Sequence, residues 1–197
     1  MALAVASTGL AAQQTPQNGP GNVGVTTTRV LDNAAVTVTR FRFGPGSHQN
    51  PHTHPFTVIE VQLTRGQVEA ANGDHRRSGL VDPGDVQIAR PGVVHWASNP
   101  SQADWDLLVI SPKKETPGDI PTAMVSYAPS TPATPQMDTV DRVLFPLSAA
   151  RLALQIDDKR TTESYEAGSV IFVPRGARYA LTNVGTTPVT VMSVGVP

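Results

Sequence analysis

The sequence contains no cysteine among its 197 residues. Disulfide bonds and thiolate metal sites are therefore excluded, and any metal ion must be held by imidazole, carboxylate, carbonyl or water ligands. The sequence also has no apolar run as long as a membrane span and no cluster of Lys and Arg, which argues against a membrane or a nucleic acid as a partner. The formal net charge is −1, and 39% of the residues are hydrophobic, which is enough for a packed core.

Basic residues are missing from the N-terminal region, because no Lys or Arg precedes Arg29. The stretch from Ala2 to Ala12 is small and apolar and ends like the cleavage site of a secretory signal, but it lacks the basic segment with which such signals begin. Two interpretations stay open: the remnant of a signal peptide, which implies a periplasmic or secreted protein, and a tail on a cytoplasmic one. In both cases residues 1–21 lie outside the expected fold.

Long stretches with helical periodicity are also missing. In their place the chain has short runs rich in Val, Thr, Ile and aromatic residues, separated by turn signals such as Asn72-Gly73. Asn-Gly between two such runs is a strong hairpin signal. The pattern predicts an all-β sandwich, barrel or jelly roll. The expected strands are Val36–Phe43, Val58–Leu63, Gln67–Ala71, Val86–Ala89, Val94–Ala97 and Trp105–Ile110.

One β unit occurs twice in the chain, at a shift of 84 positions. Leu63–Asn99 lies over Leu147–Asn183 without a gap. Residues 112–135 carry six prolines and are expected to connect the two copies, with a strand within them at Ala123–Tyr127. The second copy is short. We therefore expect strands from the N-terminal region or from a second subunit to complete it, because an incomplete sheet leaves an edge unpaired.

Three histidines form a candidate metal site. His52 and His54 precede an expected strand, and residues two apart on a strand point to the same face, so the two imidazoles can chelate one ion. His95 follows a Pro-Gly turn 41 residues later, and closure of a barrel can bring it opposite the pair. Neutral imidazole suits Fe, Ni, Zn, Cu and Mn to differing degrees. A His-x-His pair alone is weak evidence, because such pairs also arise by chance in loops.

The residues around these histidines resemble the two sequence motifs of the cupin superfamily. The first motif is similar to Gly46, His52, His54 and Gly66, and the second to Gly84, Pro91, Gly92, His95 and Asn99. In the second, the usual proline falls one position earlier, where this chain has Arg90. The resemblance implies a cupin-type double-stranded β-helix, a jelly-roll barrel of two antiparallel sheets, with His52, His54 and His95 as metal ligands inside one end.

The cupin pattern also places a glutamate shortly after the second histidine, where this chain has Val58 and Ile59. The nearest carboxylate is Glu60, displaced by at least one residue. A shift of one residue reverses the face of a strand, so the alternation of the sequence predicts that Glu60 points away from the metal. An extra residue in the loop at Pro55–Thr57 would restore the phase. Glu60 is therefore a doubtful fourth ligand, and the alternative is a three-histidine site, as in some cupin dioxygenases.

The second copy is expected to be degenerate, as in a bicupin with one working unit. Tyr179 stands where His95 stands in the first copy, and no histidine follows His95. At the same shift Gln136, Asp138 and Leu144 replace His52, His54 and Glu60. We predict a tail at residues 1–21, a metal-binding cupin unit at 22–115 and a degenerate unit with the Pro-rich connector at 116–197, and we expect a homodimer.

The resemblance implies one divalent transition metal per chain, with iron favoured and Mn, Ni, Cu or Zn as alternatives. Three neutral imidazoles that leave coordination positions open allow Fe(II) to bind O₂ and a chelating substrate. This predicts an oxidoreductase, a metal-dependent dioxygenase acting on a small organic acid, diol or diketone. The alternatives are a non-catalytic barrel that binds a small molecule or metal, and a metal-dependent isomerase or lyase. Whether the protein is an enzyme stays open.

Overall fold

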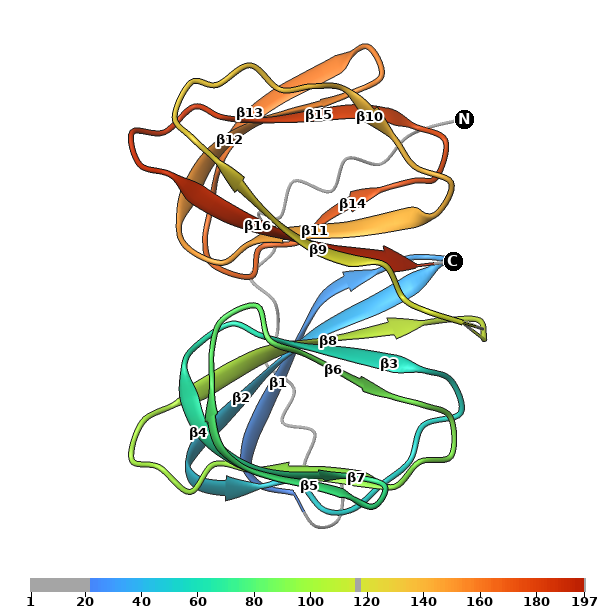
Figure 1. Ribbon diagram of the computed structural model, residues 1–197, viewed down its shortest axis with the longest axis vertical. Helices are drawn as coiled ribbons and strands as arrows, with labels where there is room; N and C mark the ends of the chain where they lie inside the picture. The colour runs from blue at the N-terminus through green and yellow to red at the C-terminus, as the bar shows by residue number, and fades with distance from the viewer. Residues whose placement is uncertain (1–21, 116–117, 197) are drawn as a thin grey trace.

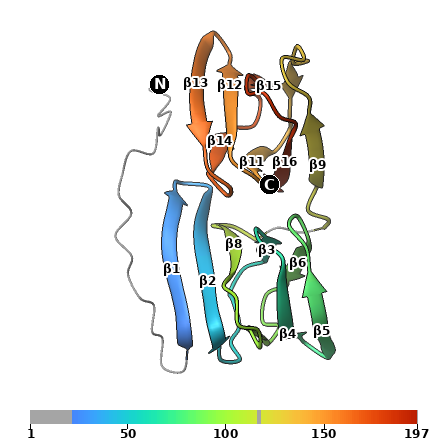
Figure 2. The ribbon, with the colours of Figure 1, turned by 90° about the vertical axis from the view of Figure 1, so that its left-hand side faces the viewer.

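The computed structural model describes residues 22–115 and 118–196, and its regular elements within these ranges are all β-strands (Figure 1). The expected tail at residues 1–21 lies outside them. The described part contains no helix that is long and apolar enough to cross a membrane. The prediction of an all-β jelly roll is confirmed, and Figure 2 shows its two β units stacked along the long axis of the molecule.

The first unit is one eight-stranded sheet that curls into the lower barrel of Figure 1. Its strand order is β5-β4-β7-β2-β8-β3-β6, and β1 pairs with β2 beside this path. The strands are β1 (Val23–Asp32), β2 (Val36–His48), β3 (Val58–Gln62), β4 (Gly66–Asn72), β5 (His75–Val81), β6 (Val86–Ala89), β7 (His95–Ser98) and β8 (Trp105–Pro112).

The second unit consists of two four-stranded sheets that face each other in the upper barrel of Figure 1. Their orders are β10-β15-β12-β13 and β14-β11-β16-β9. The strands are β9 (Thr122–Tyr127), β10 (Gln136–Met137), β11 (Asp141–Pro146), β12 (Ala150–Ile156), β13 (Lys159–Tyr165), β14 (Ile171–Val173), β15 (Arg178–Asn183) and β16 (Val189–Val196).

Strand β9, which lies in the Pro-rich connector, completes the second unit. It pairs with β16 so that Val125 lies opposite Val191. In the first unit β2 pairs with β8, and Phe41 lies opposite Leu107, each 84 positions earlier. β9 is therefore the counterpart of β2. The expectation that N-terminal strands or a second subunit complete this unit is wrong, because the connector supplies the strand and β1 pairs with β2 instead.

The repeat preserves hydrogen bonds as well as strands. Asn99 Nδ2 donates to the carbonyl of Phe43 at 2.9 Å, and Asn183 Nδ2 donates to the carbonyl of Tyr127 at 3.0 Å. Both asparagines are buried. Asn183 lies 84 positions after Asn99, and Tyr127 lies 84 positions after Phe43. A buried amide is costly unless it is hydrogen-bonded, so the two side chains fix the same corner in each unit.

A hydrophobic core lies between the two barrels, in addition to one inside each barrel. Ile59 and Val61 of β3 pack in the same buried cluster as Phe145 of β11 and Met192 of β16. This layer buries the outer face of β3, whose inner face lines the first barrel. Both faces of β3 are therefore inside the molecule.

The contact between the barrels is reciprocal. A Cβ at Gly168 would clash with Leu63, and a Cβ at Gly84 would clash with Met124 and lie tightly against Leu147. The two glycines differ by 84 positions, as do the two leucines, so each unit offers the other the same surface. Both glycines have positive φ, at 92° and 77°, which gives a second reason for glycine at these turns.

Candidate metal centre

The backbone brings the predicted histidines together. His52 lies in the segment between β2 and β3, and it forms an isolated antiparallel bridge with His95, the first residue of β7. The bridge has two hydrogen bonds, from His52 N to the His95 carbonyl at 3.0 Å and from His95 N to the His52 carbonyl at 2.9 Å. It holds the segment that carries His52 and His54 against the start of β7.

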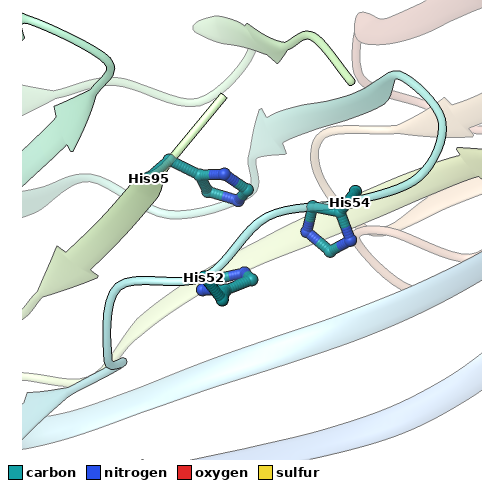
Figure 3. A group of neighbouring side chains, drawn as sticks. All are labelled: His52, His54 and His95. Carbon is teal, nitrogen blue, oxygen red and sulfur yellow. The ribbon is translucent and has the colours of Figure 1, made fainter. Parts of the chain in front are cut away.

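The three imidazoles form one cluster (Figure 3). One ring nitrogen from each of His52, His54 and His95 lies within 4.8 Å of the other two. A metal–nitrogen bond is about 2.1 Å long, so the donors of one ion lie at most about 4 Å apart. The cluster is close to that spacing, and small rotations of the imidazoles would reach it.

In His52 and His95, one ring nitrogen has no hydrogen-bond partner among the described residues and is available for an ion. His52 Nδ1 lies 2.8 Å from the carbonyl oxygen of Asn50, so this nitrogen donates and Nε2 is the free donor atom for a metal. His95 Nε2 is buried and has no hydrogen-bond partner among the described residues. A buried nitrogen without a partner is costly, and a metal ion would satisfy it. The residues present therefore fit a metal ion.

The surroundings favour the neutral form of His54 and His95. Burial, and next the charge of His52, lower the pKa of His95 to about 4. The same two causes, in the same order, lower the pKa of His54. Neutral imidazole is the form that binds a metal, so at neutral pH neither His54 nor His95 needs to lose a proton before an ion enters.

Glu60 also faces this cluster. Its Oε1 lies 3.7 Å from His95 Nε2, so the expectation that Glu60 points away from the site is wrong. The alternation was assigned correctly, because Ile59 and Val61 do share the opposite face. That apolar face packs on the second unit, however, and the face with Glu60 lines the barrel. Burial raises the pKa of Glu60 to about 7.

The space beside the cluster is a cavity of about 30 Å³. A cavity of this size has room for one or two water molecules, since one water requires about 10–15 Å³. Its described lining contains no Lys or Arg. Most of the wall residues are not predicted from the sequence, although the alternation of Phe41 and Phe43 in β2 is a usable signal. The lining is Phe41, Phe43, Gln49, His52, His54, Glu60, Leu107 and Val109.

The remaining histidines lie outside the cluster, and both His48 and His75 are exposed. Arg90, which stands where cupins have proline, donates from Nη2 to the carbonyl of Gly118 at 2.9 Å. Trp105 is buried in the first barrel, and its ring lies 4.6 Å from that of Phe43.

The second unit replaces the cluster with a hydrogen-bonded group. The hydroxyl of Tyr179 has one hydrogen to donate, and two acceptors lie within reach of it, Gln136 Oε1 at 2.9 Å and Asp138 Oδ2 at 3.0 Å. Asp138 also forms an ion pair with Arg142 at 2.9 Å. Among the described residues of this unit, no group of His, Asp and Glu side chains could hold a metal ion. Leu144, opposite Glu60, belongs to the core of the second barrel.

Comparison with known proteins gives relatives for half of the chain and structural neighbours for nearly all of it. No family model matches the sequence. Germin-like protein 8-2 of Oryza sativa subsp. japonica is 27% identical over 107 residues, which are 52% of this chain and 48% of that protein. The chain thus spans about half the length of the curated relatives it matches.

The structural neighbours share the fold at low identity. AerE from Microcystis aeruginosa superposes with a TM-score of 0.78 at 14% identity, covering 94% of this chain and 98% of that one. A cupin 2 conserved barrel domain protein from Leptotrichia buccalis has a TM-score of 0.60 at 12% identity, covering 90% and 91%. This chain has the cupin fold. It also superposes on an oxalate decarboxylase from Bacillus subtilis that has Mn(II) centres, with a TM-score of 0.72 at 12% identity over 93% and 76% of the two chains.

Proposed function

We propose that this cupin holds one divalent transition metal ion on His52, His54 and His95, with Glu60 as the candidate fourth ligand. The observation that carries the proposal is the convergence of three imidazole nitrogens within 4.8 Å of one another. The buried His95 Nε2, which lacks a hydrogen-bond partner among the described residues, supports it. The low pKa of His95 supports it too, because the neutral ring is the metal-binding form.

A bound ion would supply Lewis acidity or redox chemistry at the coordination positions that the protein leaves open. The chain's own residues have three tasks. The carbonyl of Asn50 orients the His52 ring through Nδ1. The Phe and aliphatic side chains of the cavity exclude water from the centre. Glu60, 3.7 Å from His95 and with a pKa of about 7 without an ion, can hold a proton there and would release it on binding the metal.

Iron is our first choice of metal, because three imidazoles and one carboxylate suit Fe(II). Manganese is the main alternative, and the Mn(II) centres of the structurally similar oxalate decarboxylase favour it. Nickel, copper and zinc accept the same donors. The geometry of the donors alone does not select among these ions, since selection also depends on metal availability.

The reaction we propose is oxygenation of a small organic acid, diol or diketone at the metal. The described lining contains no Lys or Arg, so a substrate carboxylate would have the metal ion as its partner of opposite charge. At about 30 Å³ the cavity admits only the coordinating end of such a substrate. The same small volume favours the second candidate, a barrel that binds metal without turnover. Both candidates share the metal site, so metal content is tested first.

The experiment is elemental analysis of the protein purified without an affinity tag or added metal. His52→Ala is compared with His75→Ala, a matched control because His75 is exposed and outside the cluster. We expect near-stoichiometric metal in the wild type and in His75→Ala, and little in His52→Ala. No metal in any of the three proteins, and no uptake on reconstitution, would contradict the proposal. Oxygen uptake with small organic acids, diols and diketones, absent in His52→Ala, then separates the enzyme from the binding barrel.

A further inference from the structure

The second unit contains a cavity at the place that corresponds to the metal centre of the first. Its volume is about 280 Å³, against about 30 Å³ for the cavity beside the histidines. Five residues of the larger cavity lie 84 positions after residues of the metal centre. Val125, Tyr127, Ala133, Gln136 and Tyr179 correspond in this order to Phe41, Phe43, Gln49, His52 and His95.

Smaller side chains explain why the second cavity is larger. Val125 replaces Phe41 at a position where the strand register is the same in both units. In the segments that follow these strands, Ala133 replaces Gln49. β9 forms one wall, β15 forms another, and residues 128–136 run across the opening between them. The repeat therefore places a cavity at the same position in both units, and larger side chains fill more of it in the first unit than in the second.

The chemistry of the lining is uncharged and rich in hydroxyl groups. Its described residues include no Lys, Arg, His, Asp or Glu. Charged ligands would lose hydration here without gaining a partner of opposite charge. Neutral polar ligands would find donors and acceptors on both sides, with apolar side chains between them. The polar residues are Ser126, Tyr127, Thr131, Thr134, Gln136 and Tyr179.

One polar group of the lining is held in place from behind. Tyr179 is buried, and its hydroxyl donates to Gln136 Oε1 at 2.9 Å. The same hydroxyl lies 3.0 Å from Oδ2 of Asp138, whose other carboxylate oxygen pairs with Arg142 at 2.9 Å. Among the described residues, the amide nitrogen of Gln136 has no hydrogen-bond partner. Gln136 thus lies against Tyr179 through its carbonyl oxygen, and its NH₂ group stays available to a ligand.

We propose that this cavity is a second binding site, which takes a neutral hydroxylated ligand of the size of a monosaccharide. Ligand cavities of proteins usually measure about 300–1,000 Å³, so this one matches the smallest ligands of that range. Hydroxyl and amide side chains next to two tyrosine rings suit a sugar ring, which has polar edges and apolar faces. The metal and the sugar would occupy equivalent places in the two barrels.

The test is titration of the ¹⁵N-labelled full chain with D-glucose and with myo-inositol, followed by amide chemical shifts. We expect saturable shifts at Tyr127, Thr131 and Gln136 in the millimolar range for at least one of the two probes. Gln136→Ala should weaken binding about fivefold through the loss of one hydrogen bond. Val125→Phe, which restores the side chain of the first unit, should abolish binding by filling the cavity.

Two controls separate this site from the metal centre and from non-specific effects. Thr162→Ala, on the exposed edge strand β13, and His52→Ala should both bind like the wild type. D-Glucuronate has the same ring with a carboxylate and should bind at least about tenfold more weakly, because the cavity offers it no cation. The proposal is overturned if neither neutral probe gives saturable shifts at these amides, if D-glucuronate binds as well as D-glucose, or if Gln136→Ala and Val125→Phe leave binding unchanged.

Discussion

Glu60 Oε1 lies 3.7 Å from His95 Nε2, yet both groups favour the neutral state. Burial raises the pKa of Glu60 to about 7, and burial together with the charge of His52 lowers the pKa of His95 to about 4. Without an ion, the pair is thus an uncharged acid beside an uncharged base. A divalent cation would reverse this preference for Glu60, because it stabilises the carboxylate.

Replacement of Glu60 by glutamine should stabilise the metal-free protein at neutral and higher pH. The reference pKa of glutamate is 4.5 and that of folded Glu60 about 7, so between these values the folded state keeps a proton that the unfolded state has lost. Rising pH therefore favours unfolding of the wild type. In Glu60→Gln this effect is missing, so its advantage should be absent below about pH 4.5 and reach on the order of 3 kcal/mol above about pH 7.

Urea denaturation in the presence of a chelator, at several pH values between these limits, measures the difference. The lowered pKa of His95 makes the protein more stable as pH rises, which is the opposite of the effect of Glu60. Because His95 is present in both proteins, its effect largely cancels in the comparison. A difference in unfolding free energy that does not change with pH would contradict the assignment of the raised pKa to Glu60.

The repeated asparagines predict equal losses in the two units. Asn183→Ala removes the amide that donates to the carbonyls of Tyr127 at 3.0 Å and Thr187 at 2.7 Å, and it leaves both carbonyls unsatisfied. We expect a loss of about 2–3 kcal/mol in unfolding free energy. Asn99→Ala should cost a similar amount, since its bonds are equivalent. Chemical denaturation measures these losses, with Gln102→Ala at an exposed position as the control. If either asparagine variant lost no more unfolding free energy than Gln102→Ala, that asparagine would not stabilise its unit.

The core between the barrels predicts that the two units unfold together. Phe145 belongs to the second unit, but its fully buried ring packs in the cluster that contains Ile59 and Val61 of the first. Phe145→Ala should cost about 3–5 kcal/mol, whereas Phe56→Ala, which is 39% exposed, should cost far less. Calorimetry of both variants should show one transition, shifted as a whole for Phe145→Ala. Two transitions, of which only one shifts, would show that the barrels are independent.

The sequence was sufficient for the histidine cluster and insufficient for its carboxylate. His52, His54 and His95 belong to motifs whose spacing carries the information, and the structure brings them together as expected. For Glu60 the alternation tells which residues share a face of the strand, but not what each face packs against. Because β3 is buried on both sides, its apolar face could be assigned to the barrel interior or to the second unit, and only the fold decides.

The role of β9 as the strand that completes the second unit could not be predicted from the sequence for a similar reason. β9 and β2 differ by the same 84 positions as the rest of the repeat, but Thr122–Tyr127 shares almost no residue types with its counterpart. Its relation to β2 is visible in the pairing of Val125 with Val191, which is a property of the register and not of composition. The cavity behind it depends on these same replacements and was hidden for the same reason.

Because β3 is buried on both sides, the second unit has a structural role, although it lacks the histidines of the first. One face of this strand presents Glu60 to the histidines, and the other presents Ile59 and Val61 to the second barrel. If the chain were cut before β9, that second face would be exposed to water as a large apolar surface, which promotes aggregation. The first barrel therefore depends on the second unit to keep Ile59 and Val61 away from water.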